Sequence, residues 1–189
     1  MAHAQKRPKK AEETHTRLAV QVETYEVSLE AEVNHHVYSP ECAWRPIDDD
    51  PLFAFDNRLI VTGTAIYPNE RSEDTYELTL YGTDAPSFNL AARMKDAQAR
   101  GEYGAPLYRS YRGREIPVYE PPKGIALIEK TRGQARWTAW APVVPRFVSD
   151  CLVLLDRDTP LYLAIHECKE AQHRWIQSLS LQTNDPREE

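Results

Sequence analysis

The stretch RLIVTGTAIYPNERSEDTYELTLY, residues 58–81, predicts a β-hairpin and with it the class of the fold. Its first part, residues 58–68, is rich in the β-branched and aromatic side chains that favour strands. Its last part, residues 75–81, alternates apolar and polar side chains. The apolar side chains that share one face are Tyr76, Leu78 and Leu80. This pattern is typical of an antiparallel sheet with one buried face.

Residues 18–33, upstream of the hairpin, alternate in the same way, but their apolar positions change parity. Even-numbered positions are apolar up to Val22, and odd-numbered positions are apolar from Tyr25 onward. Because side chains alternate between faces along a strand, the change of parity predicts a bulge or a bend near Thr24–Tyr25.

Five segments downstream also have the length and composition of strands, and short turns separate most of them. They are residues 125–130, 135–142, 148–156, 160–168 and 174–182. We therefore expect a mainly β fold, α+β by a strict count, of about eight strands. Its architecture is expected to be an antiparallel β-sandwich or a partly open β-barrel.

One helix is expected at about residues 87–100. The run NLAARMKDAQAR is rich in good helix formers, and Gly101 follows it at the position of a C-terminal cap. The chain then divides into a disordered basic and polar arm at 1–16, a single β-rich domain at 17–182 and a frayed tail at 183–189.

The composition favours a protein of the cytoplasm. No apolar run approaches the roughly 18 residues that cross a bilayer, so no membrane association is expected. The three cysteines are odd in number and widely spaced, which is not a disulfide framework.

Charge is distributed unevenly along this acidic chain. The net charge is −6, but residues 86–140 hold ten basic and five acidic side chains, a local charge of +5 that leaves −11 for the rest. Such an asymmetry indicates a local surface for an anionic partner rather than general attraction to polyanions.

The centre of this basic region is PLYRSYRGREIP, residues 106–117, in which arginines alternate with tyrosines. Arginine binds phosphate through two parallel hydrogen bonds, and tyrosine stacks on bases. The predicted ligand-binding residues, which an extended loop and the next hairpin could present together, are Tyr108, Arg109, Tyr111, Arg112, Arg114, Lys123 and Arg132. The alternative is a solvated loop whose arginines pair with Glu102, Glu115 and Glu120.

Trp137 and Trp140 are the candidate residues of a protein interface. They are three positions apart, so a regular strand cannot turn both toward the core, and one of them is expected to be partly exposed. A bulge near Ala139, or tryptophans packed on two covered faces, would be the alternatives.

No metal site, cofactor or catalytic residue is predicted. The histidines and cysteines lack the paired spacing of zinc ligands, and no nucleophile elbow or phosphate-binding glycine loop is present. His166 and Cys168 would share a face of one strand, which leaves an enzyme with a pocket near them as an alternative.

The sequence thus predicts a non-catalytic binding module that recognises a nucleic acid or an acidic or phosphorylated partner through its Tyr/Arg-rich segment. A module for protein–protein contact or homo-oligomerisation, using exposed tryptophans or edge strands, is the first alternative. The enzyme is the second.

Overall fold

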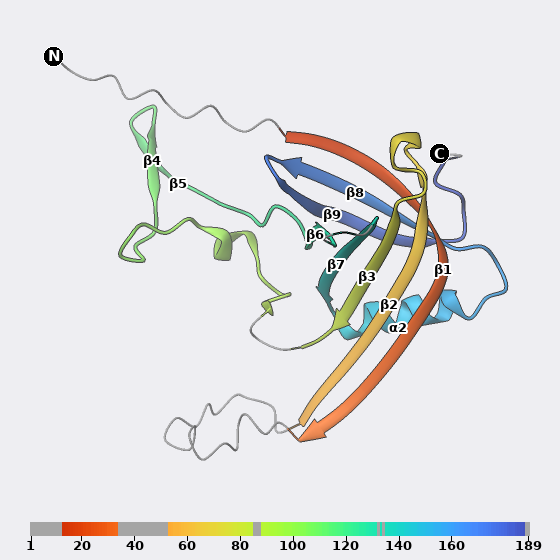
Figure 1. Cartoon of the computed structure of the whole chain (residues 1–189). Helices are drawn as coiled ribbons and strands as arrows, with labels where there is room; N and C mark the ends of the chain where they lie inside the picture. The colour runs from red at the N-terminus through yellow and green to blue at the C-terminus, as the bar shows by residue number, and fades with distance from the viewer. Residues whose placement is uncertain (1–12, 34–52, 85–87, 132, 134, 188–189) are drawn as a thin grey trace.

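Seven strands close into a barrel in the computed structural model, which describes residues 13–33, 53–84, 88–131, 133 and 135–187 (Figure 1). In order around the barrel they are β1 (Glu13–Val33), β2 (Phe53–Tyr67), β3 (Thr75–Gly82), β7 (Arg136–Val143), β6 (Ala126–Lys130), β9 (His173–Gln182) and β8 (Tyr162–Glu170). The expected mainly β, barrel-like fold is confirmed. The barrel is closed rather than partly open.

The two local predictions about the first strands are confirmed. β2 and β3 form the expected hairpin, whose turn contains the short 3₁₀ helix η1 (Asn69–Arg71). The register of β1 against β2 shifts between Val22 and Thr24, where the parity of the apolar positions changes. Gly63 lies opposite this bulge, and a Cβ atom there would be 2.1 Å from the carbonyl oxygen of Gln21.

One pair of neighbouring strands is parallel, which differs from the expected antiparallel order. β3 and β7 run in the same direction, with Tyr76 beside Trp137 and Leu80 beside Ala141. The chain leaves the barrel after β3, returns as β6 and turns back antiparallel into β7. A long excursion of this kind is what a parallel neighbour requires.

The α-helix of the described residues lies elsewhere than expected. α2 (Pro145–Leu155) occupies most of residues 148–156, for which the sequence predicts a strand, so that prediction is wrong. The helix buries Val148, Cys151 and Leu155, one stripe at helical spacing, and Pro145 starts it at the position where proline is favoured. In Figure 1 the helix lies across one end of the barrel.

The helix predicted at 87–100 is also wrong over the described residues 88–100. They contain the 3₁₀ helix η3 (Met94–Ala97), followed by extended backbone that bridges Gln98 to Tyr119. Leu90 and Met94, which would form the apolar stripe of such a helix, are exposed. Good intrinsic propensity does not form a stable helix when its apolar stripe has nothing to cover.

The barrel interior is filled with apolar side chains. Fully buried residues come from most of the strands, among them Leu18, Leu59, Leu78, Leu163 and Ile176. One small cavity of about 10 Å³ lies between Tyr76, Ile128 and Ile176.

Both ends of the expected domain can be compared with the structure. β1 begins at Glu13 and pairs with β8 from there, so residues 13–16 of the expected arm are strand. Residues 1–12 and 188–189 lie outside the described residues. None of the described helices has the length and apolar character to cross a membrane.

Candidate functional site

The Tyr/Arg-rich segment forms a β-hairpin of its own. β4 (Tyr108–Tyr111) pairs antiparallel with β5 (Arg114–Pro117), and neither strand joins the barrel sheet. The turn between them consists of Arg112 and Gly113, with φ angles of 50° and 75°. Two residues of positive φ are typical of the tight turn that matches the twist of a two-stranded ribbon, and glycine suits the second position.

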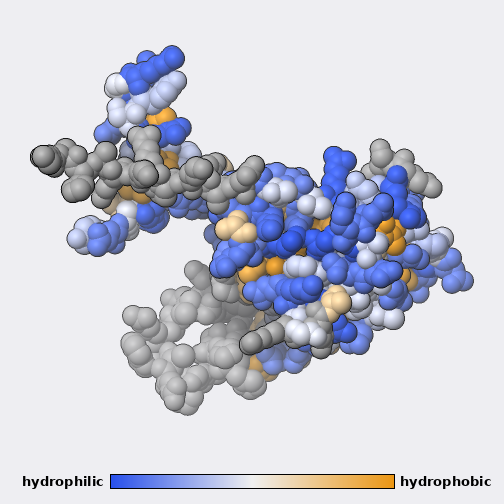
Figure 2. Space-filling view, turned by 45° about the horizontal axis from the view of Figure 1, so that its top comes forward, coloured by the Kyte–Doolittle hydropathy of each residue, from blue (hydrophilic) through white to orange (hydrophobic). Residues whose placement is uncertain are grey.

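Three backbone hydrogen bonds connect the segments at the open end of this hairpin. Ala99 donates to the carbonyl of Val118, Leu107 donates to that of Ala99, and Val118 donates to that of Leu107, each at 2.8–3.0 Å. Figure 1 shows β4 and β5 projecting away from the barrel, and Figure 2 shows a mostly hydrophilic lobe separated from the main body. The segment is therefore a structured projection.

The pairing of the strands decides which side chains share a face. Arg109, Tyr111 and Arg114 lie on one face of the hairpin, because Tyr111 is the direct partner of Arg114 and Arg109 is two residues away. We call these three residues, with Arg112 in the turn, the cationic face. Tyr108 lies on the opposite face with Ser110, so the two tyrosines do not project together.

The arginines of the cationic face have no carboxylate partner in the part of the chain that the structure describes. The expected alternative, pairing with Glu102, Glu115 and Glu120, is not found there. Arg112 instead lies over the ring of Tyr111, 5.3 Å from its centroid. Residues 108–115 are exposed throughout.

Lys123, another predicted ligand-binding residue, is not part of this face. Lys123 forms an ion pair with Glu170 at the end of β8. Arg132 lies outside the described residues.

The two tryptophans of β7 differ as the sequence predicts. Trp140 is 47% exposed and stacks with Tyr81 at 5.2 Å between centroids and with Phe88 at 5.6 Å. Burial, together with the nearby carboxylate of Asp56, raises the pKa of Tyr81 to about 12. Trp137 packs against the core instead.

Trp137 belongs to an ionic cluster near the β2–β3 turn that sequence reasoning missed. Its ring stacks on Tyr76, its Nε1–H donates to Asp74 at 2.9 Å, and three cations lie over it. Their distances to the ring centroid are 4.6 Å for Arg71, 5.0 Å for Arg174 and 5.2 Å for Lys130. Burial raises the pKa of Tyr76 well above its usual range.

Glu167 is the anion at the centre of this cluster. Its side chain is 1% exposed, it accepts a hydrogen bond from Arg174, and Arg71 is 3.6 Å away. The second carboxylate oxygen is buried without a hydrogen-bond partner among the described residues. The sequence does carry a signal for this residue. Glu167 follows Leu163 and Ile165 at intervals of two, so it lies on the same core-facing side of β8.

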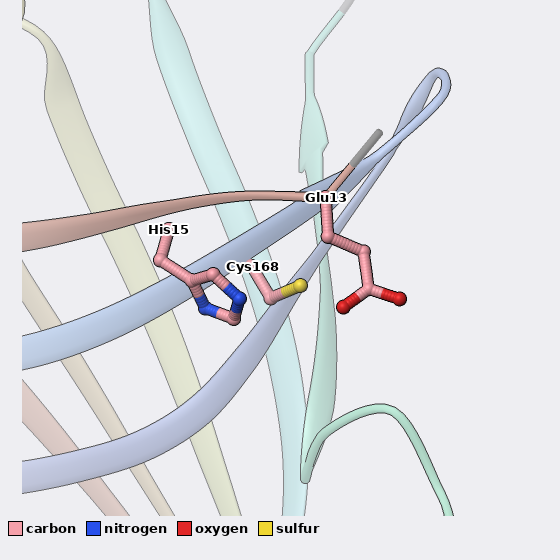
Figure 3. Close-up of side chains that lie close together, drawn as sticks. All are labelled: Glu13, His15 and Cys168. Atoms are coloured by element: carbon pink, nitrogen blue, oxygen red, sulfur yellow. The ribbon is translucent and has the colours of Figure 1, made fainter. Parts of the chain in front are cut away.

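His166 and Cys168 share the outer face of β8, as expected. His166 borders a groove of about 590 Å³ over β1, β8 and β9, lined also by Arg17, Ser178 and Gln182. Cys168 is buried, and it lies beside His15 and Glu13 of β1 (Figure 3). β1 was not predicted to contribute to a site here.

Comparisons with known proteins identify no relative: no family model, curated protein or solved structure matches this chain.

Proposed function

We propose that this protein binds nucleic acid through the cationic face of the β4–β5 hairpin. The observation that carries the proposal is that Arg109, Arg112 and Arg114 are exposed on one projecting ribbon, beside Tyr111, without a carboxylate partner among the described residues. Unpaired guanidinium groups are available to phosphate, whose geometry matches their two parallel N–H donors.

The shape of the hairpin favours the same ligand. A two-stranded β-ribbon fits the major groove of duplex DNA, which is about 12 Å wide. On a single strand, Tyr111 would stack on a base while the arginines contact the backbone. The acidic remainder of the chain repels a polyanion and so confines binding to the hairpin. Nucleic-acid binding and the free thiols of Cys151 and Cys168 both favour a cytoplasmic location.

The test is fluorescence anisotropy with labelled single-stranded and duplex DNA and RNA over a series of salt concentrations. The wild type is compared with the triple variant Arg109→Gln/Arg112→Gln/Arg114→Gln. The slope of log K against log salt is expected to fall in magnitude by up to about 2.7 in the variant, because each lost phosphate contact removes about 0.9.

The matched control is Arg58→Gln/Arg146→Gln/Arg157→Gln, which removes the same charge from exposed positions outside the hairpin. It should bind nearly as the wild type does. Tyr111→Ala should weaken single-strand binding about fivefold or more, and Tyr108→Ala, on the opposite face, should not. Equal losses in the two triple variants, or no binding at low salt, would refute the proposal.

Trp140 favours a second candidate function, a contact with another protein or a second copy. A half-exposed tryptophan stacked on Tyr81 and Phe88 offers a large, rigid contact area. Light scattering measures the molar mass of the wild type and of Trp140→Gln. If Trp140 mediates self-association, the wild type should have the higher mass, and this association should tolerate salt.

A further inference from the structure

Three potential metal ligands converge on the outer face of the barrel, where β1 and β8 pair. His15 and Cys168 are direct cross-strand partners, and Glu13 precedes His15 by two residues on the same face. The carboxylate, imidazole and thiol ligand atoms all lie within 4.8 Å of one another. Figure 3 shows the three side chains gathered on one side of the two strands.

We propose that Glu13, His15 and Cys168 bind a divalent cation of the zinc class. Oxygen, nitrogen and sulfur donors together are a ligand set that Zn²⁺ accepts. In a tetrahedral site, ligand atoms about 2.0–2.3 Å from the ion are roughly 3.5 Å apart, so side-chain rotation alone brings these atoms to bonding distance.

The surroundings of the three residues suit such an ion. Cys168 is 5% exposed, and this burial would shield a metal–sulfur bond from solvent. Glu13 and His15 are exposed, so an ion can enter from solvent, and a fourth position is open to water.

His166 adds a neighbour on the open side. Its ring centroid is 5.3 Å from that of His15, and it borders the groove that contains Arg17. Glu13 and His15 do not stand out in the sequence as ligands, because the register of β1 against β8 brings them to Cys168.

Metal binding would also join the first barrel strand to β8, so it should stabilise the folded protein. An ion at about 100 times its Kd raises the folding equilibrium constant roughly a hundredfold. We expect Zn²⁺ to raise the Tm by several degrees.

The experiment uses the full chain, stripped of metal with a chelator. Titration calorimetry with Zn²⁺ gives the stoichiometry and Kd, and Co²⁺ gives an independent readout through the thiolate-to-cobalt charge-transfer band. The wild type should bind one ion with that band. His15→Gln and Glu13→Gln, at exposed positions, should weaken binding at least tenfold, and Cys168→Ser should abolish the band.

Two controls separate this site from other histidines and cysteines. His173→Gln changes an exposed histidine of β9, and His35→Gln/His36→Gln/Cys42→Ser changes ligand types outside the described residues. Both should keep the wild-type Kd and the band. The proposal is overturned if the wild type shows no cobalt–thiolate band, or if His15→Gln binds as tightly as the wild type. Loss of binding in the His35/His36/Cys42 variant alone would also overturn it.

Discussion

Glu167 shows how much a single side chain can depend on its neighbours. A carboxylate that is 1% exposed has lost nearly all of its hydration, and Arg174 and Arg71 replace that hydration only in part. Buried ion pairs contribute little net stability compared with apolar residues of the same size, but they become costly when one member is removed.

Arg174→Ala is expected to lower the free energy of unfolding by about 3 kcal/mol, because it leaves Glu167 buried with only the more distant Arg71. Urea denaturation measures the change. Arg146→Ala is the control, since Arg146 forms an exposed pair with Asp150 and should change little. Adding Glu167→Gln to Arg174→Ala should recover part of the loss. Equal effects of the two arginine substitutions would contradict the buried role of Glu167.

Cys151 is expected to make stability fall at alkaline pH. Burial in α2, with a contribution from Asp150, raises the pKa of its thiol from about 9 to about 11. The unfolded chain therefore loses this proton first, and the stabilisation present below pH 9 is lost between pH 9 and pH 11. In urea denaturation across that window, Cys151→Ala should show a shallower fall than the wild type. Parallel curves would show that the thiol does not contribute.

At the scale of elements, the bulge in β1 depends on a close approach of two backbones. Gly63 has no Cβ, and a Cβ there would be 2.1 Å from the carbonyl oxygen of Gln21, which is a severe overlap with main chain. Gly101 differs, because the nearest atom to an added Cβ is the end of the Leu107 side chain at 3.3 Å.

Gly63→Ala should therefore lower the free energy of unfolding by roughly 3 kcal/mol or more, or prevent folding, because β1 and β2 would have to move apart. Gly101→Ala should have a much smaller effect. Denaturation followed by circular dichroism measures both. A Gly63→Ala protein as stable as Gly101→Ala would mean that the strands do not approach this closely.

Elements with a local signal were predictable, and elements that depend on distant partners were not. The β2–β3 hairpin and the bulge follow from alternation within a few residues. The sequence predicts a strand instead of α2 because most of the apolar residues of the helix fall in the run CLVLL, which also suits a strand, although Pro145 indicates a helix start. In residues 88–100 the composition favours a helix, but Leu90 and Met94 are exposed, and no α-helix forms.

The candidate sites show the same division. The Tyr/Arg-rich segment is visible in the sequence, but the faces of its hairpin depend on the turn at Arg112 and Gly113. The cluster of Glu13, His15 and Cys168 depends on the pairing of strands from opposite parts of the chain. No spacing rule within one segment can reveal such a site.

At the scale of the whole molecule, the barrel and the projecting hairpin are separate structural parts. The apolar core lies in the barrel, and the hairpin joins no strand of the barrel sheet (Figure 1). Substitutions on the cationic face should therefore change ligand binding with little effect on the free energy of unfolding of the barrel. The basic segment of the sequence, residues 86–140, contains the hairpin but also extends into the barrel strands β6 and β7. The closed order of strands and the parallel β3–β7 pair could not be derived from the sequence.

The closure of the barrel between β1 and β8 has a consequence for synthesis on the ribosome. β1 leaves the exit tunnel long before its partner β8 is made. At about 5–20 residues per second, the nascent strand waits roughly 7–30 s with one edge unpaired. Exposed glutamates of β1 at 23, 26, 30 and 32 lie beyond residues 13–21, the stretch that pairs with β8, and they place like charges on the remaining edge of the same strand. Neighbouring nascent chains on a polysome would thereby be discouraged from pairing through it.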